Sequence, residues 1–254
     1  MSKKNLIVGQ SGGPTAVINS SLYGVVSEGL RHPEQIQHIY GMVNGIEGFL
    51  AGTVLDFATA LPGSNLEKLK TTPGAYLGSC RYKLPESLED PVYPRLFQKF
   101  REMNIGWFFY IGGNDSMDTV SKLSRYAAQT GSDIRIIGEP KTIDNDLVHT
   151  DHTPGFGSAA RYVASTVREI TTDANVYEKK SVTIVEIMGR HAGWLTAASA
   201  LARKYKGDNP LLIYLPETTF DQEAFLKAVE KSFEKNCNVI VCVSEGIHDA
   251  EGTF

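Results

Sequence analysis

The sequence GWFFYIGGNDS, at residues 106–116, shows the pattern on which the architecture of this chain rests. Residues 106–111 are apolar or aromatic without alternation, which is typical of a strand buried on both faces of a sheet. Two glycines follow, and then three residues that commonly begin helices. Residues 116–130 continue with apolar positions at helical spacing. A buried strand, a glycine turn and an amphipathic helix in this order predict one repeat of a parallel α/β sheet.

The same alternation extends to both sides of this stretch. Further strands are expected at 5–9, 38–42, 134–137, 182–187, 211–215 and 238–243. Helices are expected at 15–30, 93–103, 157–173, from about 193, and after a capping aspartate at 221. Buried strands that alternate with amphipathic helices predict an α/β fold of two three-layer αβα domains with mainly parallel sheets. We expect the domains at 1–150 and 151–254, with the boundary in the loop at 140–154.

Composition restricts the kind of partner. The chain has 254 residues and a formal net charge of −4, which disfavours a nucleic acid or an anionic membrane surface as the main partner. No apolar stretch approaches the length of a membrane span. The three cysteines form no CxxC pair, so a reduced, cytoplasmic protein is expected.

Four loops at the expected strand ends carry unusual chemistry, and in parallel α/β sheets ligands bind at this edge. Gly12 and Gly13 follow the first strand, where glycines and a helix N-terminus favour an anion. A tight turn without a ligand explains this loop equally well. Residues 112–116 repeat the arrangement, and here the alternative is that Asn114, Asp115 or Ser116 only caps the helix.

The third loop, PKTIDND at 140–146, places Lys141 close to Asp144 and Asp146. A carboxylate that removes a hydroxyl proton beside a cation that neutralises phosphate charge is what phosphoryl transfer requires. The alternative is a solvated acidic turn, which the apolar strand before it makes less attractive. The fourth loop, MGRHAG at 188–193, offers Arg190 for a phosphate or a hydroxyl.

Other catalytic classes lack support in the sequence. No P-loop lysine motif and no G-x-S-x-G elbow occur. His149 and His152 are three residues apart in an irregular segment, and such a pair is usually coincidental rather than a metal site.

Together with LGSCR at 77–81, these loops resemble the 6-phosphofructokinases along essentially the whole chain. The resemblance implies a phosphofructokinase-like fold whose C-terminal part is truncated here. It implies that Asp144 is the base, that Gly12, Gly13 and Arg81 bind the phosphoryl donor, and that Asn114 contacts Mg²⁺ through its carbonyl oxygen or a water. The residues implied to bind the sugar phosphate are Thr142, Asp144, Asp146, Met188, Gly189, Arg190 and Glu245.

Two positions favour pyrophosphate over ATP as the donor. Asp115 stands where ATP-dependent members usually have glycine, and Lys141 stands where they have glycine before the threonine. A carboxylate about 4 Å from the α-phosphate of a nucleotide would repel it by about 4 kcal/mol at an effective dielectric constant near 20. Lys141 would stabilise charge on the phosphoryl group in transit. Asp115 and Lys141 are therefore expected to act in catalysis together with Asp144.

The resemblance thus implies a glycolytic, reversible transfer from pyrophosphate to the 1-hydroxyl of fructose 6-phosphate by a homodimer or homotetramer. Three alternatives stay open at this point. The donor can be ATP, the chain can be a non-catalytic regulatory subunit of the same fold, or the sugar can be another one, such as sedoheptulose 7-phosphate.

Overall fold

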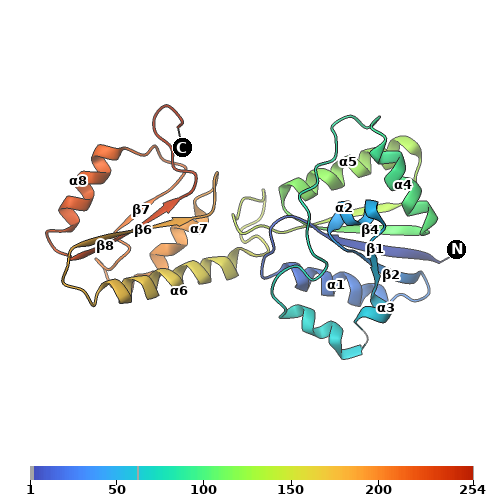
Figure 1. Cartoon of the computed structure of the whole chain (residues 1–254), viewed down its shortest axis with the longest axis horizontal. Coiled ribbons are helices and arrows are strands. Elements are labelled where there is room, and N and C mark those ends of the chain that lie inside the picture. Colours follow the sequence, from blue (N-terminus) through green and yellow to red (C-terminus); the bar gives the residue numbers. More distant parts are fainter. Residues whose placement is uncertain (1–2, 62, 254) are drawn as a thin grey trace. The chain divides into compact units, whose positions relative to one another are not determined.

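The computed structural model describes residues 3–61 and 63–253 and divides into two compact units. Unit 1 is Met1–Lys141 and unit 2 is Thr142–Phe254, so the division falls inside the loop at 140–154 rather than at residue 150. Unit 1 runs from blue to yellow-green and unit 2 from yellow to red in Figure 1. In the described ranges no helix combines the length and the apolar character that a membrane span requires.

Unit 1 is built on a five-stranded sheet in the order β3–β2–β1–β4–β5. The central strand β1 pairs in parallel with β2 and with β4, and β4 pairs in parallel with β5. Only β3 is antiparallel, with Tyr40 opposite Asp56. The side chains of Leu6, Ile7 and Val8 on β1 are buried on both faces, as the unbroken apolar run predicted. The strands are β1 (Lys4–Gln10), β2 (Ile36–Met42), β3 (Val54–Asp56), β4 (Ile105–Gly112) and β5 (Arg135–Pro140).

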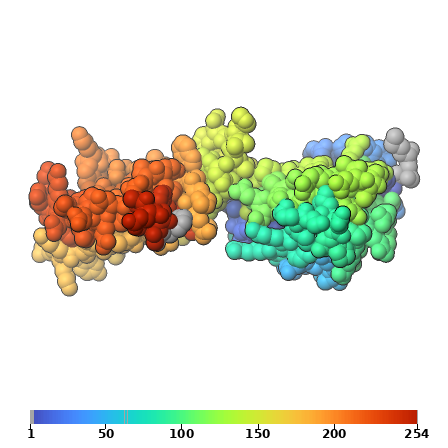
Figure 2. Space-filling view, turned by 90° about the horizontal axis from the view of Figure 1, so that it is seen from above, coloured from blue at the N-terminus to red at the C-terminus, as the bar shows by residue number. Residues whose placement is uncertain are grey.

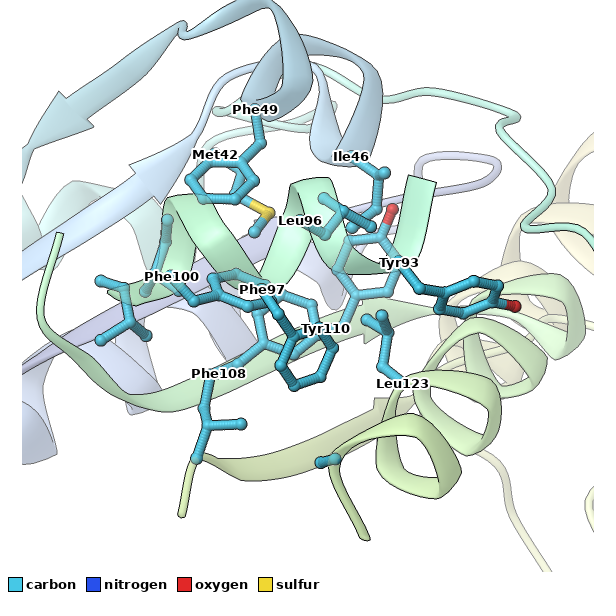
Figure 3. Packing of buried hydrophobic residues seen from close by; sticks show 14 of the residues in the cluster. Met42, Ile46, Phe49, Tyr93, Leu96, Phe97, Phe100, Phe108, Tyr110 and Leu123 are labelled. Atoms are coloured by element: carbon cyan, nitrogen blue, oxygen red, sulfur yellow. The ribbon is translucent and has the colours of Figure 1, made fainter. Parts of the chain in front are cut away.

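One face of this sheet is covered by α2 (Gly45–Ala51), α4 (Val92–Glu102) and α5 (Asn114–Thr130). Figure 3 shows the aromatic core beneath these helices. The ring of Phe100 stacks on Phe49 at 5.2 Å and lies 5.5 Å from the ring of Phe108. Figure 2 shows teal and green segments forming the surface of unit 1 on the viewed side.

The opposite face of the sheet packs against α1 (Ile18–Leu30), α3 (Phe57–Ala60) and the 3₁₀ helix η1 (Gly63–Lys70). Helix α1 begins three residues later than the expected start at 15, because residues 15–18 form a turn in which the amide of Ile18 donates to the carbonyl of Thr15 at 3.2 Å. The short elements between 45 and 70 were not expected from the sequence. Unit 1 is therefore a three-layer αβα domain, as predicted.

Unit 2 has a three-stranded parallel sheet in the order β6–β8–β7. Helix α6 (Phe156–Ala174), the single turn α7 (Trp194–Ala197) and the 3₁₀ helix η2 (Ala198–Ala202) form a core with β6 (Ser181–Ile187) and β8 (Asn238–Ser244). Helix α8 (Gln222–Ser232) lies on the other side of the sheet (Figure 1), where Phe225 contacts Tyr214 of β7 (Leu212–Tyr214). Asp221 caps α8 as predicted, since its side chain accepts a hydrogen bond of 2.9 Å from the amide of Ala224.

Candidate functional site

The first glycine loop is tied to the segment at 77–81. The Gly12 amide donates to the carbonyl of Cys80 at 3.2 Å, and the Ser79 hydroxyl donates to the carbonyl of Gly12 at 2.5 Å. The amide of Leu77 also donates to the side chain of Gln10 at 2.9 Å. The Gly12 N–H was expected to meet donor phosphates, but here it is used inside the protein. These hydrogen bonds fix the loop beside Arg81, whose side chain is exposed.

In the second glycine loop, only Gly112 stands where a side chain would clash with its neighbours. A Cβ at Gly112 would lie 2.0 Å from the Ser116 hydroxyl oxygen and 2.9 Å from the carbonyl oxygen of Ser11. At Gly113 a Cβ would meet only the carbonyl oxygen of Lys141, at 3.8 Å. The backbone thus leaves room at Gly113, where the helix begins.

Helix α5 starts without the capping side chain that was the alternative to ligand binding. Its N-cap is Gly113, and within the described chain no side chain caps it. Asn114, Asp115 and Ser116 all lie in the first turn instead. Ser116 is buried, and its hydroxyl oxygen has no hydrogen-bond partner among the described residues. An uncapped N-terminus that carries a partial positive charge suits an anion.

Asp115 does not stand alone. Its carboxylate oxygen lies 3.2 Å from the ammonium of Lys83, and the two side chains are 71% and 72% exposed. Water therefore screens its charge, and its repulsion of a nearby phosphate approaches about 1 kcal/mol at 4 Å rather than about 4 kcal/mol. The repulsion of about 4 kcal/mol expected from the sequence is therefore too large, because Lys83, two positions after Arg81, pairs with the exposed carboxylate.

Lys141 links the two glycine loops of unit 1. Its side chain is buried, and its ammonium donates to the carbonyl of Gly13. Its backbone amide donates to the carbonyl of Gly112 at 2.9 Å. A Cβ at Gly12 would lie 3.9 Å from the same ammonium. The structure therefore brings a cation to the carboxyl ends of β1 and β4, which is the edge at which the sequence placed the donor.

The segment that begins unit 2 is a closed loop around Asp144. Asn145 adopts φ of 59°, and its side chain bonds to the carbonyl of Asp151 at 3.1 Å and to the amide of Thr153 at 2.8 Å. The hydroxyl of Thr153 donates to the carbonyl of Thr142 at 2.9 Å. The amide of Asp144 donates to the Thr142 hydroxyl at 3.0 Å. Such a braced loop differs from a solvated acidic turn, because its backbone is held on both sides of the carboxylate.

The remaining residues gather at the carboxyl ends of β6 and β8. Gly189 has φ of 124°, and a Cβ there would lie 2.5 Å from the carbonyl oxygen of Ala192. Its amide donates to Glu245 at 3.1 Å, and its carbonyl accepts from Ser244 at 2.7 Å. Met188 is 59% exposed and Arg190 is exposed. Glu245 thus holds the loop that presents Met188 and Arg190.

Metal-binding groups of the usual kind are not present in residues 3–61 and 63–253. No set of three or more His, Cys, Asp or Glu side chains converges there. His149 and His152, the pair discounted from the sequence, are both exposed.

Structural comparison shows a phosphofructokinase-like α/β fold, as predicted. Pyrophosphate-dependent phosphofructokinase from Nitrosospira multiformis matches all of this chain with a TM-score of 0.91 and 39% identity, over 63% of its own chain. The corresponding protein from Marinobacter aquaeolei gives a TM-score of 0.88 and 41% identity over 98% of this chain and 63% of its own.

The chain belongs to the phosphofructokinase family, because the family model Phosphofructokinase matches residues 5–254. Pyrophosphate–fructose 6-phosphate 1-phosphotransferase of Rhodospirillum rubrum is 47% identical over 253 residues, which are 99% of this chain and 60% of that protein. The chain thus spans about three fifths of the length of such relatives. The family prediction made from the sequence is confirmed.

Proposed function

We propose that the protein carrying this chain transfers a phosphoryl group from pyrophosphate to the 1-hydroxyl of D-fructose 6-phosphate, giving fructose 1,6-bisphosphate and phosphate. The observation that carries this proposal is the buried Lys141, whose ammonium bonds the Gly13 carbonyl while its backbone bonds Gly112. A cation held between two glycine loops suits a small, highly charged anion. The names of the relatives from Rhodospirillum and Nitrosospira point to the same donor.

Unit 1 would bind the donor. The uncapped start of α5 would offer backbone N–H groups to phosphate oxygens. Lys141 and Arg81 would neutralise the oxygens that bridge the two phosphoryl groups and those of the group in transit. Asp115 would occupy the space in which a nucleotide would place its α-phosphate.

Unit 2 would bind the acceptor and supply the base. Asp144 would take the proton of the sugar 1-hydroxyl as that oxygen attacks phosphorus, with Thr142 and Asp146 beside it. Met188, Gly189, Arg190 and Glu245 would hold the sugar phosphate. Lys141 and Asp144 are three residues apart, so their Cα atoms lie within about 11 Å of each other.

The residues present fit a Mg²⁺ ion that is bound largely through the substrate. Mg²⁺ keeps several waters and often takes only one or two protein oxygens besides phosphates. Asn114, in the first turn of α5, would contribute its carbonyl oxygen directly or through water. Bound there, the ion would neutralise charge on the phosphates.

A coupled assay with pyrophosphate and with ATP as alternative donors tests the proposal. Turnover with pyrophosphate in the presence of Mg²⁺, and little with ATP, is expected. Turnover with ATP alone would establish an ATP-dependent enzyme, and binding of pyrophosphate without turnover would indicate a regulatory subunit. We further propose that the protein is cytoplasmic and forms a homodimer or a homotetramer. Light scattering on the purified protein would distinguish the two oligomers.

A further inference from the structure

Lys122 is a lysine of α5 that neither the motifs nor the proposed mechanism uses. Its side chain is only 3% exposed. Its ammonium donates to the carbonyl of Leu84 at 3.0 Å and to Glu86 at 2.6 Å, and it lies 2.6 Å from a carboxylate oxygen of Asp118. Three oxygen atoms match the three N–H donors of an ammonium. A buried lysine costs stability unless it is paired in this way, so these contacts make up a built anchor.

The anchor holds the segment that carries Arg81. On one side of that residue, the carbonyl of Cys80 accepts from the Gly12 amide at 3.2 Å. On the other side, the carbonyl of Leu84 accepts from Lys122. Only residues 81–83 lie between the two fixed carbonyls. The hydroxyl of Tyr93 adds a bond of 2.5 Å to the carbonyl of Pro85.

The neighbouring ion pair between Lys83 and Asp115 cannot hold the loop at 81–86 in the same way. Lys83 and Asp115 are each about seven-tenths exposed, and exposed pairs contribute little to stability. Lys122, by contrast, has a buried side chain, and its bond to the backbone carbonyl of Leu84 restrains the chain itself. Without Lys122, the segment after Arg81 would keep the exposed Lys83–Asp115 pair and the hydrogen bond from Tyr93 to the carbonyl of Pro85.

We propose that Lys122 is a positioning residue that fixes the loop at 81–86, and so presets Arg81 for an incoming pyrophosphate. The role assigned to Arg81 rests on the proposed function. The physical gain is preorganisation: a long side chain mounted on a fixed backbone loses less freedom when it binds an anion.

The experiment compares four variants with the unchanged protein. Lys122→Met keeps the length of the side chain and removes the ammonium, while Lys122→Arg keeps a cation with donors. Tyr93→Phe keeps the buried ring and removes only the bond to Pro85. The matched control is Lys227→Met, which removes an i,i+4 pair with Glu223 from an exposed helix face of unit 2. Hydrogen exchange of the amides at 81–86 and calorimetric affinity for pyrophosphate are measured for each.

Lys122→Met is expected to accelerate exchange at 81–86 and to weaken pyrophosphate binding by about tenfold. Tyr93→Phe should shift both readouts in the same direction by less, Lys122→Arg should restore most of the affinity, and the control should change neither. Unchanged exchange in Lys122→Met would overturn the anchor. Faster exchange with unchanged affinity would overturn the positioning role. If the unchanged protein binds no pyrophosphate, the proposed function and the role of Arg81 fail, while the exchange result still decides the anchor.

Discussion

Neutralising Asp115 provides the sharpest test of the proposal that this residue excludes a nucleotide. Asp115→Asn removes the charge and keeps the bulk, whereas Asp115→Gly removes both. The carboxylate is 71% exposed and lies 3.2 Å from Lys83. For a phosphate about 4 Å away, screening by water leaves about 1 kcal/mol of repulsion. Asp115→Asn should therefore strengthen ATP binding by only about fivefold, and Asp115→Gly should strengthen it further because space is released.

Removing the counter-ion of Asp115 should change the affinity for ATP in the opposite direction. Lys83→Met removes the counter-ion, so the carboxylate repels a nucleotide more strongly and ATP binding should weaken. Asp133→Asn is a suitable control, because Asp133 is also an exposed carboxylate paired with a lysine, Lys4, in unit 1. It should not alter the affinity for either donor.

The assay is competition of ATP against bound pyrophosphate, measured by calorimetry at two salt concentrations. The charge contribution of Asp115 should shrink at high salt, while the contribution of its bulk should not. The reasoning is refuted if Asp115→Asn and Asp115→Gly both leave ATP affinity within twofold of the unchanged protein, or if Lys83→Met improves ATP binding.

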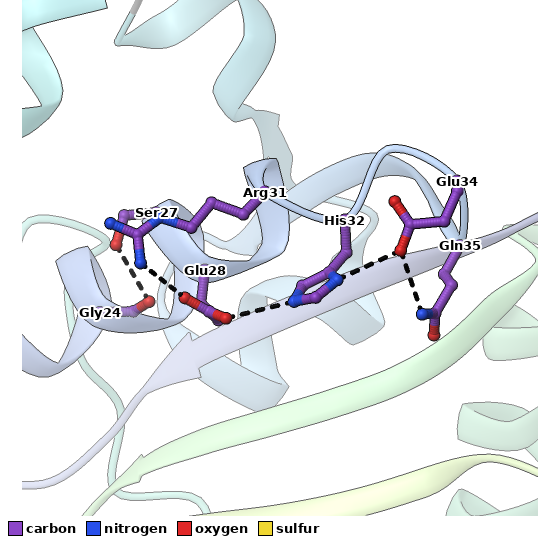
Figure 4. A network of polar contacts seen from close by, with 7 residues as sticks. All are labelled: Gly24, Ser27, Glu28, Arg31, His32, Glu34 and Gln35. Atoms are coloured by element: carbon purple, nitrogen blue, oxygen red, sulfur yellow. Dashed lines mark hydrogen bonds and ion pairs between the residues drawn. The ribbon is translucent and has the colours of Figure 1, made fainter.

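Four further results are expected. Asp144→Asn should abolish turnover while leaving pyrophosphate affinity within about twofold, since it removes the base and keeps the shape; unchanged turnover would exclude Asp144 as the base. In thermal denaturation, Gly112→Ala should cost about 1–3 kcal/mol, whereas Gly113→Ala should stay within about 0.5 kcal/mol; equal losses would contradict the packing described for this loop. Glu245→Ala should raise the KM for fructose 6-phosphate more than it lowers kcat, because the loop it holds would loosen. Hydrogen bonds to the carboxylates of Glu28 and Glu34 raise the pKa of His32 above 6.5 (Figure 4). The stability that this protonated histidine contributes is therefore present below pH 6.5 and is lost as the pH rises through the raised pKa. His32→Gln should flatten that part of the curve of stability against pH.

The main strands and helices of both units follow from the sequence because their signals are local. The run at 106–111 is apolar throughout and became β4, and the spacing after it became α5. The segment at 45–70 gave no such signal. It holds a seven-residue helix, a three-residue strand, a four-residue helix and an eight-residue 3₁₀ helix, which are too short for a period to show. Tertiary contacts with the sheet determine these elements.

The site was predictable in its residue types and less so in its contacts. Glycines, Lys141 and the carboxylates stood out because they follow buried strands. The bond from the Lys141 ammonium to Gly13 joins residues 128 positions apart, and no local pattern reports such a pair. Lys122 had one local signal, the i,i+4 spacing from Asp118, but its bond to Leu84 depends on the folded chain.

The bracing of the Asp144 loop separates residues that must be kept from residues that can change. Asn145 and Thr153 are buried and close the loop at its base. The tip at 148–150 is exposed, and Val148 is 84% exposed. A fluorophore or a short peptide tag attached at the tip would be joined to a loop whose base is held by hydrogen bonds. It could therefore report ligand binding near Asp144 without disturbing the carboxylate.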